Sequence, residues 1–153
     1  HRQTPPRLDA SDEPAIIIGD GYIYTPLNLF TDYITNGYKV HKDIIRVCIE
    51  QLYKQPLVRS DFPYITELTL RENNTAYIVH LLNYVKEKKS RKLEIEEERF
   101  TACDCTISVK TPFIPQKVRL VPEGKEIEFD YADGYTTFKL DRTSGHTMIE
   151  ILK

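Results

Sequence analysis

Histidine and cysteine side chains are the first candidates for chemistry in this sequence, because both types bind metal ions and can act as bases or nucleophiles. A histidine metal site usually shows a second histidine four residues away or cysteines at a fixed spacing. None of the four histidines has such a partner in the sequence: His1, His41, His80 and His146. We interpret His80 as a hydrogen-bonded core histidine rather than a ligand or base, and we expect His146 in a turn after Gly145.

Cys103 and Cys105 place two thiols two residues apart. In a strand such residues share one face, so both thiols are expected on the same face. A metal or redox site would need further ligands nearby in the sequence, and this segment supplies none. The third cysteine, Cys48, is interpreted as a small buried apolar residue of a helix. We therefore predict no metal or cofactor site, and an odd cysteine count favours a reducing, cytoplasmic location.

Acidic, glycine-rich and basic segments do not form a recognisable catalytic motif. The three glutamates at 96–98 are interpreted as a solvated strand end rather than a catalytic carboxylate pair. The Gly-Asp-Gly sequence at 19–21 lacks the further glycine and lysine of a phosphate-binding loop. The basic run at 86–92 is followed directly by acidic residues and reads as a polar hairpin loop. We predict no catalytic residue, and the net charge of −2 argues against nucleic-acid binding.

Tyrosines are the remaining candidates for a binding site. The chain has ten tyrosines and six phenylalanines but no tryptophan. Aromatic rings can stack on sugar rings, and Tyr84, Tyr131 and Tyr135 are the candidates for such a contact. Strand alternation, however, assigns Tyr131 to a core face. Carbohydrate binding is therefore an alternative interpretation.

The elements that must position these residues fall into two regions. From residue 64 onwards the sequence shows only strand signals with regular spacing, which is typical of an antiparallel sandwich or barrel. The expected strands are residues 65–71, 76–84, 92–97, 104–110, 117–121, 126–132, 135–140 and 147–152. Both faces of 76–84 are apolar, so this strand is expected to be central and covered on both sides.

The strongest local signal in this region is Asp133-Gly134, which predicts a two-residue type I′ hairpin. The hairpin would place three pairs opposite each other: Phe129 with Phe138, Ile127 with Leu140, and Glu128 with Lys139. Apolar partners then share one face and opposite charges share the other, which supports this register.

Residues 1–55 mix strand and helix signals. A hairpin is expected over 15–24, and a helix over 26–36 is expected between an N-cap at Thr25 and a stop at Gly37.

A second helix is expected over 42–54. It should be well buried because its apolar residues form a wide stripe: Ile44, Ile45, Val47, Cys48, Ile49 and Leu52.

The two regions imply a division into domains. Residues 56–63 begin and end with proline, so we expect no regular structure there and treat the segment as a linker. Residues 1–55 have helices but hardly any sheet, so we interpret them as the tail of an α/β domain. Residues 64–153 are predicted to form an antiparallel β-sandwich of about eight strands. The predicted fold class is α+β, mostly β, and since the chain starts with histidine we expect it to begin inside a longer protein.

Several segments resemble the C-terminal region of bacterial glycoside hydrolases. Gly21-Tyr22-Ile23-Tyr24 and residues 1–6, 29–33, 42–45, 51–52 and 56–58 are similar to the end of a class I glutamine-amidotransferase-like domain, as in enzymes with a β-galactosidase trimerisation domain. Residues 79–84, 118–122 and 145–149 resemble strands of the C-terminal β-domain in such proteins.

This resemblance implies a parent enzyme whose upstream (β/α)₈ barrel holds two catalytic carboxylates outside the present chain. It also implies a homo-oligomer formed through the amidotransferase-like domain. We therefore expect a non-catalytic C-terminal accessory module that stabilises or assembles a glycoside hydrolase and that is not an enzyme by itself. The alternative is a β-sandwich module that binds carbohydrate or protein. No partner among nucleic acids or membranes is expected, since the apolar runs are too short to cross a bilayer.

Overall fold

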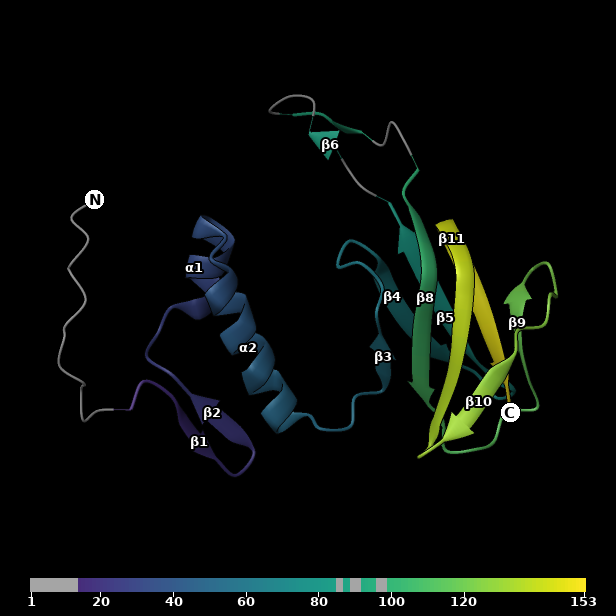
Figure 1. Ribbon diagram of the computed structural model, residues 1–153, viewed down its shortest axis with the longest axis horizontal. Helices are drawn as coiled ribbons and strands as arrows, with labels where there is room; N and C mark the ends of the chain where they lie inside the picture. The colour runs from purple at the N-terminus through teal and green to yellow at the C-terminus, as the bar shows by residue number, and fades with distance from the viewer. Residues whose placement is uncertain (1–13, 85–86, 89–91, 96–98) are drawn as a thin grey trace. The chain divides into compact units, whose positions relative to one another are not determined.

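The computed structural model describes residues 14–84, 87–88, 92–95 and 99–153 (Figure 1). The chain divides into two compact units, His1–Gln55 (unit 1) and Pro56–Lys153 (unit 2). Antiparallel strands predominate and two helices accompany them, which confirms the α+β, mostly β class. The motif at 1–6, the glutamates at 96–98 and part of the basic run at 86–92 lie outside the described residues.

Unit 1 begins with a two-stranded hairpin, as predicted. Strands β1 (Ile17–Gly19) and β2 (Tyr22–Tyr24) are antiparallel, with Ile18 opposite Ile23. The turn between them requires a positive φ of 76° at Gly21, which glycine adopts without steric cost.

Helix α1 (Leu29–Asn36) follows the hairpin and starts later than the sequence suggested. Thr25 does not cap it. Its hydroxyl donates to the Ala15 carbonyl at 2.9 Å and accepts from the Leu27 N–H at 3.2 Å, and so fixes the chain after β2. The helix ends as predicted at Gly37, which has a left-handed φ of 68°.

Helix α2 (Lys39–Leu52) is the longer helix of unit 1, and none of its side chains is buried. An ion pair between Lys39 and Asp43, at 2.5 Å, joins adjacent turns and lowers the pKa of the Asp43 carboxyl. The expectation that this helix is well buried is wrong. The described part of unit 1 offers only α1 and a two-stranded hairpin as cover, and that is too little to enclose the apolar stripe.

Unit 2 is built from antiparallel strands. They are β3 (Val58–Ser60), β4 (Glu67–Glu72), β5 (Ala76–Asn83), β6 (Glu87–Lys88), β7 (Glu94–Ile95), β8 (Thr101–Lys110), β9 (Lys117–Val121), β10 (Phe129–Ala132) and β11 (Tyr135–Leu152). β3 lies within the predicted linker and pairs with β8. The expectation of no regular structure at 56–63 is therefore wrong, because the two prolines flank β3 and do not interrupt it.

The long strand β11 joins two sheets, and it is the yellow ribbon of Figure 1. Its first half pairs with β8 and β10, and its second half pairs with β5 and β9. The change of partner occurs between Ser144, opposite Thr101 of β8, and Gly145, opposite Asn83 of β5. The two strands predicted at 135–140 and 147–152 are thus one, and His146 lies in a strand rather than a turn.

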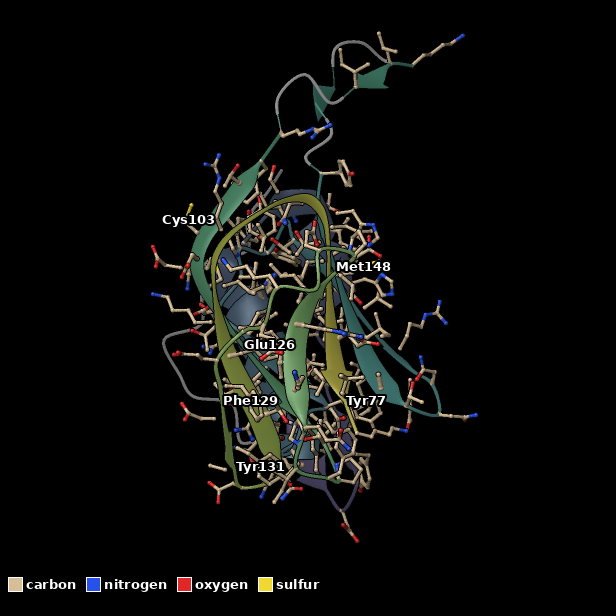
Figure 2. The ribbon with its side chains drawn as sticks, turned by 90° about the vertical axis from the view of Figure 1, so that its right-hand side faces the viewer. Tyr77, Cys103, Glu126, Phe129, Tyr131 and Met148 are labelled. Carbon is tan, nitrogen blue, oxygen red and sulfur yellow. The ribbon has the colours of Figure 1, made fainter. Side chains whose placement is uncertain are left out.

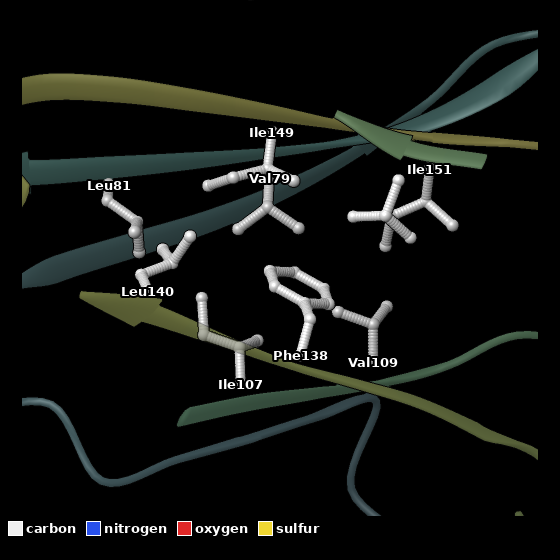
Figure 3. Close-up of a cluster of buried hydrophobic side chains, with 9 residues drawn as sticks. Val79, Leu81, Ile107, Val109, Phe138, Leu140, Ile149 and Ile151 are labelled. Carbon is white, nitrogen blue, oxygen red and sulfur yellow. The ribbon is translucent and has the colours of Figure 1, made fainter. Parts of the chain in front are cut away.

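The core lies between the two halves of β11. Figure 3 shows Val79 and Ile149 from one layer meeting Phe138 and Ile107 from the other. The complete buried cluster is Val79, Leu81, Ile107, Val109, Val118, Phe138, Leu140, Ile149 and Ile151. β5 is a central strand, as predicted, but its other face, with Ile78 and Leu82, is only half-buried and not covered as expected.

The predicted hairpin forms, although it is shorter than expected. Asp133 and Gly134 have φ values of 53° and 77°, which fit a type I′ turn, and Phe129 lies opposite Phe138. The pairs Ile127–Leu140 and Glu128–Lys139 do not form. Instead the Ile127 N–H donates to the Val118 carbonyl at 2.8 Å, so the chain before β10 leaves β11 and pairs with β9.

The cross-strand pair provides a stability test. Phe138 is 2% exposed, so Phe138→Ala should lower the free energy of unfolding by about 3–5 kcal/mol. Its partner Phe129 is half-buried, and Phe129→Ala is the matched control with a smaller expected loss. Urea unfolding followed by circular dichroism measures both values. Equal losses for the two variants would contradict this packing.

Candidate functional site

Unit 1 exposes many apolar side chains on both of its helices. Phe30 and Ile34 on α1 are 67% and 82% exposed, and Val47 and Ile49 on α2 are 49% and 54% exposed. We define the unit 1 apolar surface as Ile18, Leu27, Phe30, Ile34, Val40, Val47, Ile49 and Leu52. Ile18, Val40 and Val47 line one groove, and Phe30, Ile49 and Leu52 line another. Grouped apolar side chains of this kind commonly mark surfaces that bind another protein or domain. This surface is therefore the first candidate for a functional site.

Two apolar grooves run along α2 within this unit. The larger, of about 290 Å³, lies between α2 and the hairpin and is lined by Ile16, Ile18, Ile23, Val40, Asp43, Ile44, Val47, Cys48 and Gln51. The smaller, of about 180 Å³, lies between α2 and α1 and is lined by Ile23, Thr25, Leu29, Phe30, Ile45, Cys48, Ile49 and Leu52. The apolar stripe predicted from the sequence thus lines two open grooves and leaves them ready to accept apolar side chains.

Unit 2 carries a groove of a different kind. A space of about 990 Å³ and a second of about 410 Å³ share Glu126, Ile127, Glu128 and Lys139 in their walls, so they form one polar groove. One wall is the segment 125–130 and the other is β11. In Figure 2, Glu126, Phe129 and Tyr131 follow one another along this segment. The groove offers carboxylates, the hydroxyls of Thr106 and Thr137, and an aromatic ring.

Ion pairs set the charges at this groove. The Lys117 ammonium donates to Glu126 at 2.5 Å, which lowers the pKa of that carboxyl. The Asp104 carboxylate, at 2.7 Å from the Lys139 ammonium, raises the pKa of Lys139. Both shifts favour the charged forms near neutral pH. A general acid would instead need a carboxyl with a raised pKa.

The three candidate tyrosines occupy different environments. Tyr135 is 7% exposed, its hydroxyl donates to the Pro56 carbonyl at 2.8 Å, and the Arg59 guanidinium lies 4.3 Å from its ring centre. Tyr131 is half-buried, and its hydroxyl donates to the Thr111 carbonyl at 3.3 Å. Tyr84 is exposed and lies beside Gly145.

The separation of these tyrosines decides whether they can act together. Tyr131 pairs with Thr136, and Tyr84 lies beside Gly145, roughly 30 Å further along β11. The structure therefore does not bring Tyr84 and Tyr131 onto one platform. Their contact with sugar stays a prediction.

The two neighbouring cysteines point to different faces, contrary to expectation. Asp104 between them has a positive φ of 55°, which turns the strand at this point. Cys103 is exposed and projects outward in Figure 2, whereas Cys105 is buried and donates its S–H to the Cys103 carbonyl at 3.2 Å. Burial, and then the negative charge of Asp61, raises the pKa of the Cys105 thiol. Cys105 is therefore not an activated nucleophile.

Two histidines meet although no sequence motif predicted their contact. His80 Nδ1 and His146 Nε2 are 3.1 Å apart and share a hydrogen bond. The residues are far apart in sequence, and the pairing of β5 with β11 brings them together. Only knowledge of this strand pairing could have revealed the contact. In the part of the chain that the structure describes, no three side chains of the types His, Cys, Asp and Glu are grouped to hold a metal ion, and no helix could cross a membrane.

Comparison with known proteins finds a solved structure with a similar fold. No family model matches the chain, and no curated protein matches it. Among solved structures, α-L-fucosidase isoenzyme 2 from Paenibacillus thiaminolyticus is similar to it, with a TM-score of 0.87 and 25% sequence identity. The similarity covers 98% of this chain and 23% of that chain. This chain has the fold of one part of a glycoside hydrolase. Both units fall within the matched region, and most of the fucosidase chain has no counterpart here.

Proposed function

We propose that this chain is a non-catalytic accessory module of a longer glycoside hydrolase, and that the unit 1 apolar surface docks on the rest of that enzyme. The observation that carries the proposal is the similarity over 98% of this chain and only 23% of the fucosidase. Most of that fucosidase chain lies outside the matched region, so we expect the corresponding remainder of the longer enzyme to cover the unit 1 apolar surface.

Burial of the exposed apolar side chains of unit 1 would lower the free energy of the docked state. Complete burial of one Val, Leu, Ile or Phe side chain is worth roughly 1.5–3 kcal/mol. About half or more of each of four such side chains is exposed: Phe30, Ile34, Val47 and Ile49. The two grooves along α2 also have room for side chains from a partner. Docking would give α1 and α2 the sheet or helix cover that unit 1 itself does not supply.

The finer assignment follows the resemblance described above. Unit 1 would be the end of an amidotransferase-like domain, unit 2 the C-terminal β-domain, and the catalytic carboxylates would lie on an upstream barrel. The same surface would contribute to a homo-oligomer if that domain assembles. A cytoplasmic location is supported by Cys48, Cys103 and Cys105, all of which are free thiols.

A charge placed on the unit 1 apolar surface should disrupt docking. In the longer enzyme, Val47→Glu should separate the thermal unfolding of this module from that of the rest, because an uncompensated carboxylate at an apolar interface costs at least about 1–3 kcal/mol. In the isolated chain the same change should have little effect, since Val47 is 49% exposed. Differential scanning calorimetry measures both.

Thr31→Glu is the matched control. Thr31 is an exposed polar residue of α1, and its replacement adds the same charge to the same unit. Unfolding of the longer enzyme should stay cooperative in this variant. If Val47→Glu behaves like Thr31→Glu in the longer enzyme, the proposed docking surface is wrong.

The isolated chain should have no glycosidase activity. Incubation with a panel of aryl glycosides should release no aryl alcohol above the buffer rate, because the proposal assigns the catalytic carboxylates to another domain. The longer enzyme serves as the positive control in the same assay. Reproducible turnover by the chain alone, abolished by a single carboxylate substitution such as Glu128→Gln, would refute an accessory role.

The polar groove of unit 2 favours carbohydrate binding as a second candidate function. Its hydroxyls, carboxylates and Phe129 combine hydrogen-bonding groups with an apolar ring, as sugar recognition requires. A glycan-array signal that Thr137→Val removes would favour this function. Absence of signal would leave docking as the role of the module.

A further inference from the structure

We propose that His80 and His146 form a binding site for a divalent transition-metal cation that prefers nitrogen ligands, such as Ni²⁺. The proposal concerns unit 2 alone and is independent of the proposed docking function. It rests on the placement of the two histidines, the geometry of their rings and the rigidity of the strands that carry them.

Strand pairing puts both histidines on one face of the sheet. His80 lies opposite Met148, and His146 lies opposite Leu82, so the two histidines are diagonal neighbours across β5 and β11. Val79 and Leu81, the sequence neighbours of His80, point the other way, into the core, and so does Ile149, three residues after His146. The imidazoles therefore stand on the outer face, where His146 is exposed and His80 is half-buried, and a cation can reach them from solvent.

The rings meet end to end. The ring centres are 5.3 Å apart and the ring planes differ by 14°, while the facing nitrogens are only 3.1 Å apart. A face-to-face stack would bring the ring centres much closer together than this. The rings must therefore extend away from each other, with His80 Nδ1 and His146 Nε2 directed at one another along the line that joins them.

This separation suits two ligands of one metal ion. Metal–imidazole bonds of about 2.0–2.1 Å place adjacent ligand nitrogens about 3.0–3.4 Å apart, depending on the angle at the metal. The observed 3.1 Å lies within that range. One histidine now donates its N–H to the other. To bind a cation, that donor moves its proton to its other ring nitrogen. Each ring then turns by roughly 40°, largely about its broad χ2 torsion, so that both lone pairs meet at a point beside the line between the nitrogens and about 2.0–2.1 Å from each.

The strands hold this geometry in place. β5 is hydrogen-bonded to β4 on one side and to β11 on the other, and β11 is paired with β9 across Met148. Neither histidine backbone can shift without breaking these ladders. A site on paired strands is more pre-organised than a site on a loop, so the two imidazoles lose little freedom when a cation binds, and water would complete the coordination.

Isothermal titration with Ni²⁺ tests the site. The untagged chain, stripped with EDTA, is alkylated at its thiols so that cysteine ligands are blocked. All variants also carry His1→Ala, because a terminal amine next to an imidazole can itself chelate the ion. One Ni²⁺ should bind per chain in this background, and the ion should raise the melting temperature because it links β5 to β11.

His80→Asn and His146→Asn should each weaken Ni²⁺ binding by about tenfold or more and abolish the thermal shift. His41→Gln, at a histidine of α2 in the other unit, is the matched control and should leave both unchanged. Melting curves in EDTA show whether each variant is folded, and His146→Asn is the safer of the two because that side chain is exposed. Unchanged affinity in folded His146→Asn, or no saturable binding in the His1→Ala background, would overturn the proposal.

Discussion

The backbone hydrogen bonds of β11 are the interaction on which unit 2 depends. The strand runs from Tyr135 to Leu152, and it pairs first with β8 and β10 and then with β5 and β9. Because one strand belongs to both sheets, Phe138 and Ile149 face the same core from opposite layers. At the change of partner the buried Asn83 amide donates to Thr143 and accepts from Thr66, so no polar atom of that side chain is left without a bond. The same strand forms one wall of the polar groove and carries His146.

The described part of unit 1, residues 14–55, has no comparable constraint. Its hairpin has two short strands, and its helices leave most of their apolar side chains, though not Leu29, at least partly exposed to water. Two strands and two helices cannot bury the apolar area that these sequences carry, and an isolated hairpin is at best marginally stable. Exposed side chains such as Phe30 and Ile34 would therefore be stabilised by a partner surface. The docking proposal assigns this partner surface to the rest of a longer enzyme, because the similar fold covers only 23% of the fucosidase chain.

Sequence reasoning succeeded where the signal was local. Asp133-Gly134 predicted the type I′ turn and the Phe129–Phe138 pair, and Gly37 predicted the end of α1. It failed where distant strands decide the outcome. Gly145 and His146 were expected in a turn between two strands, yet β5 takes over as partner at Gly145 and one strand continues through both residues. Ile127 hydrogen-bonds to Val118 of β9 instead of pairing with β11. The contact of His80 with His146 depends on the pairing of β5 with β11, which no local pattern encodes. The burial of α2 was overestimated because an apolar stripe shows that burial would stabilise a helix. It does not show that the chain contains other elements that cover the stripe.

Hydroxyl-radical footprinting with mass spectrometry tests the central claim most directly, because it reads the solvent exposure of individual side chains. Phe30, Ile34 and Ile49 would be compared between the isolated chain and the longer enzyme, with oxidation in the unfolded chain as the reference. The account predicts fast oxidation of all three in the isolated chain at every protein concentration, and strong protection in the longer enzyme. Equal oxidation in both proteins, or protection in the isolated chain that grows with concentration and so indicates a second copy, would contradict docking on the rest of the enzyme.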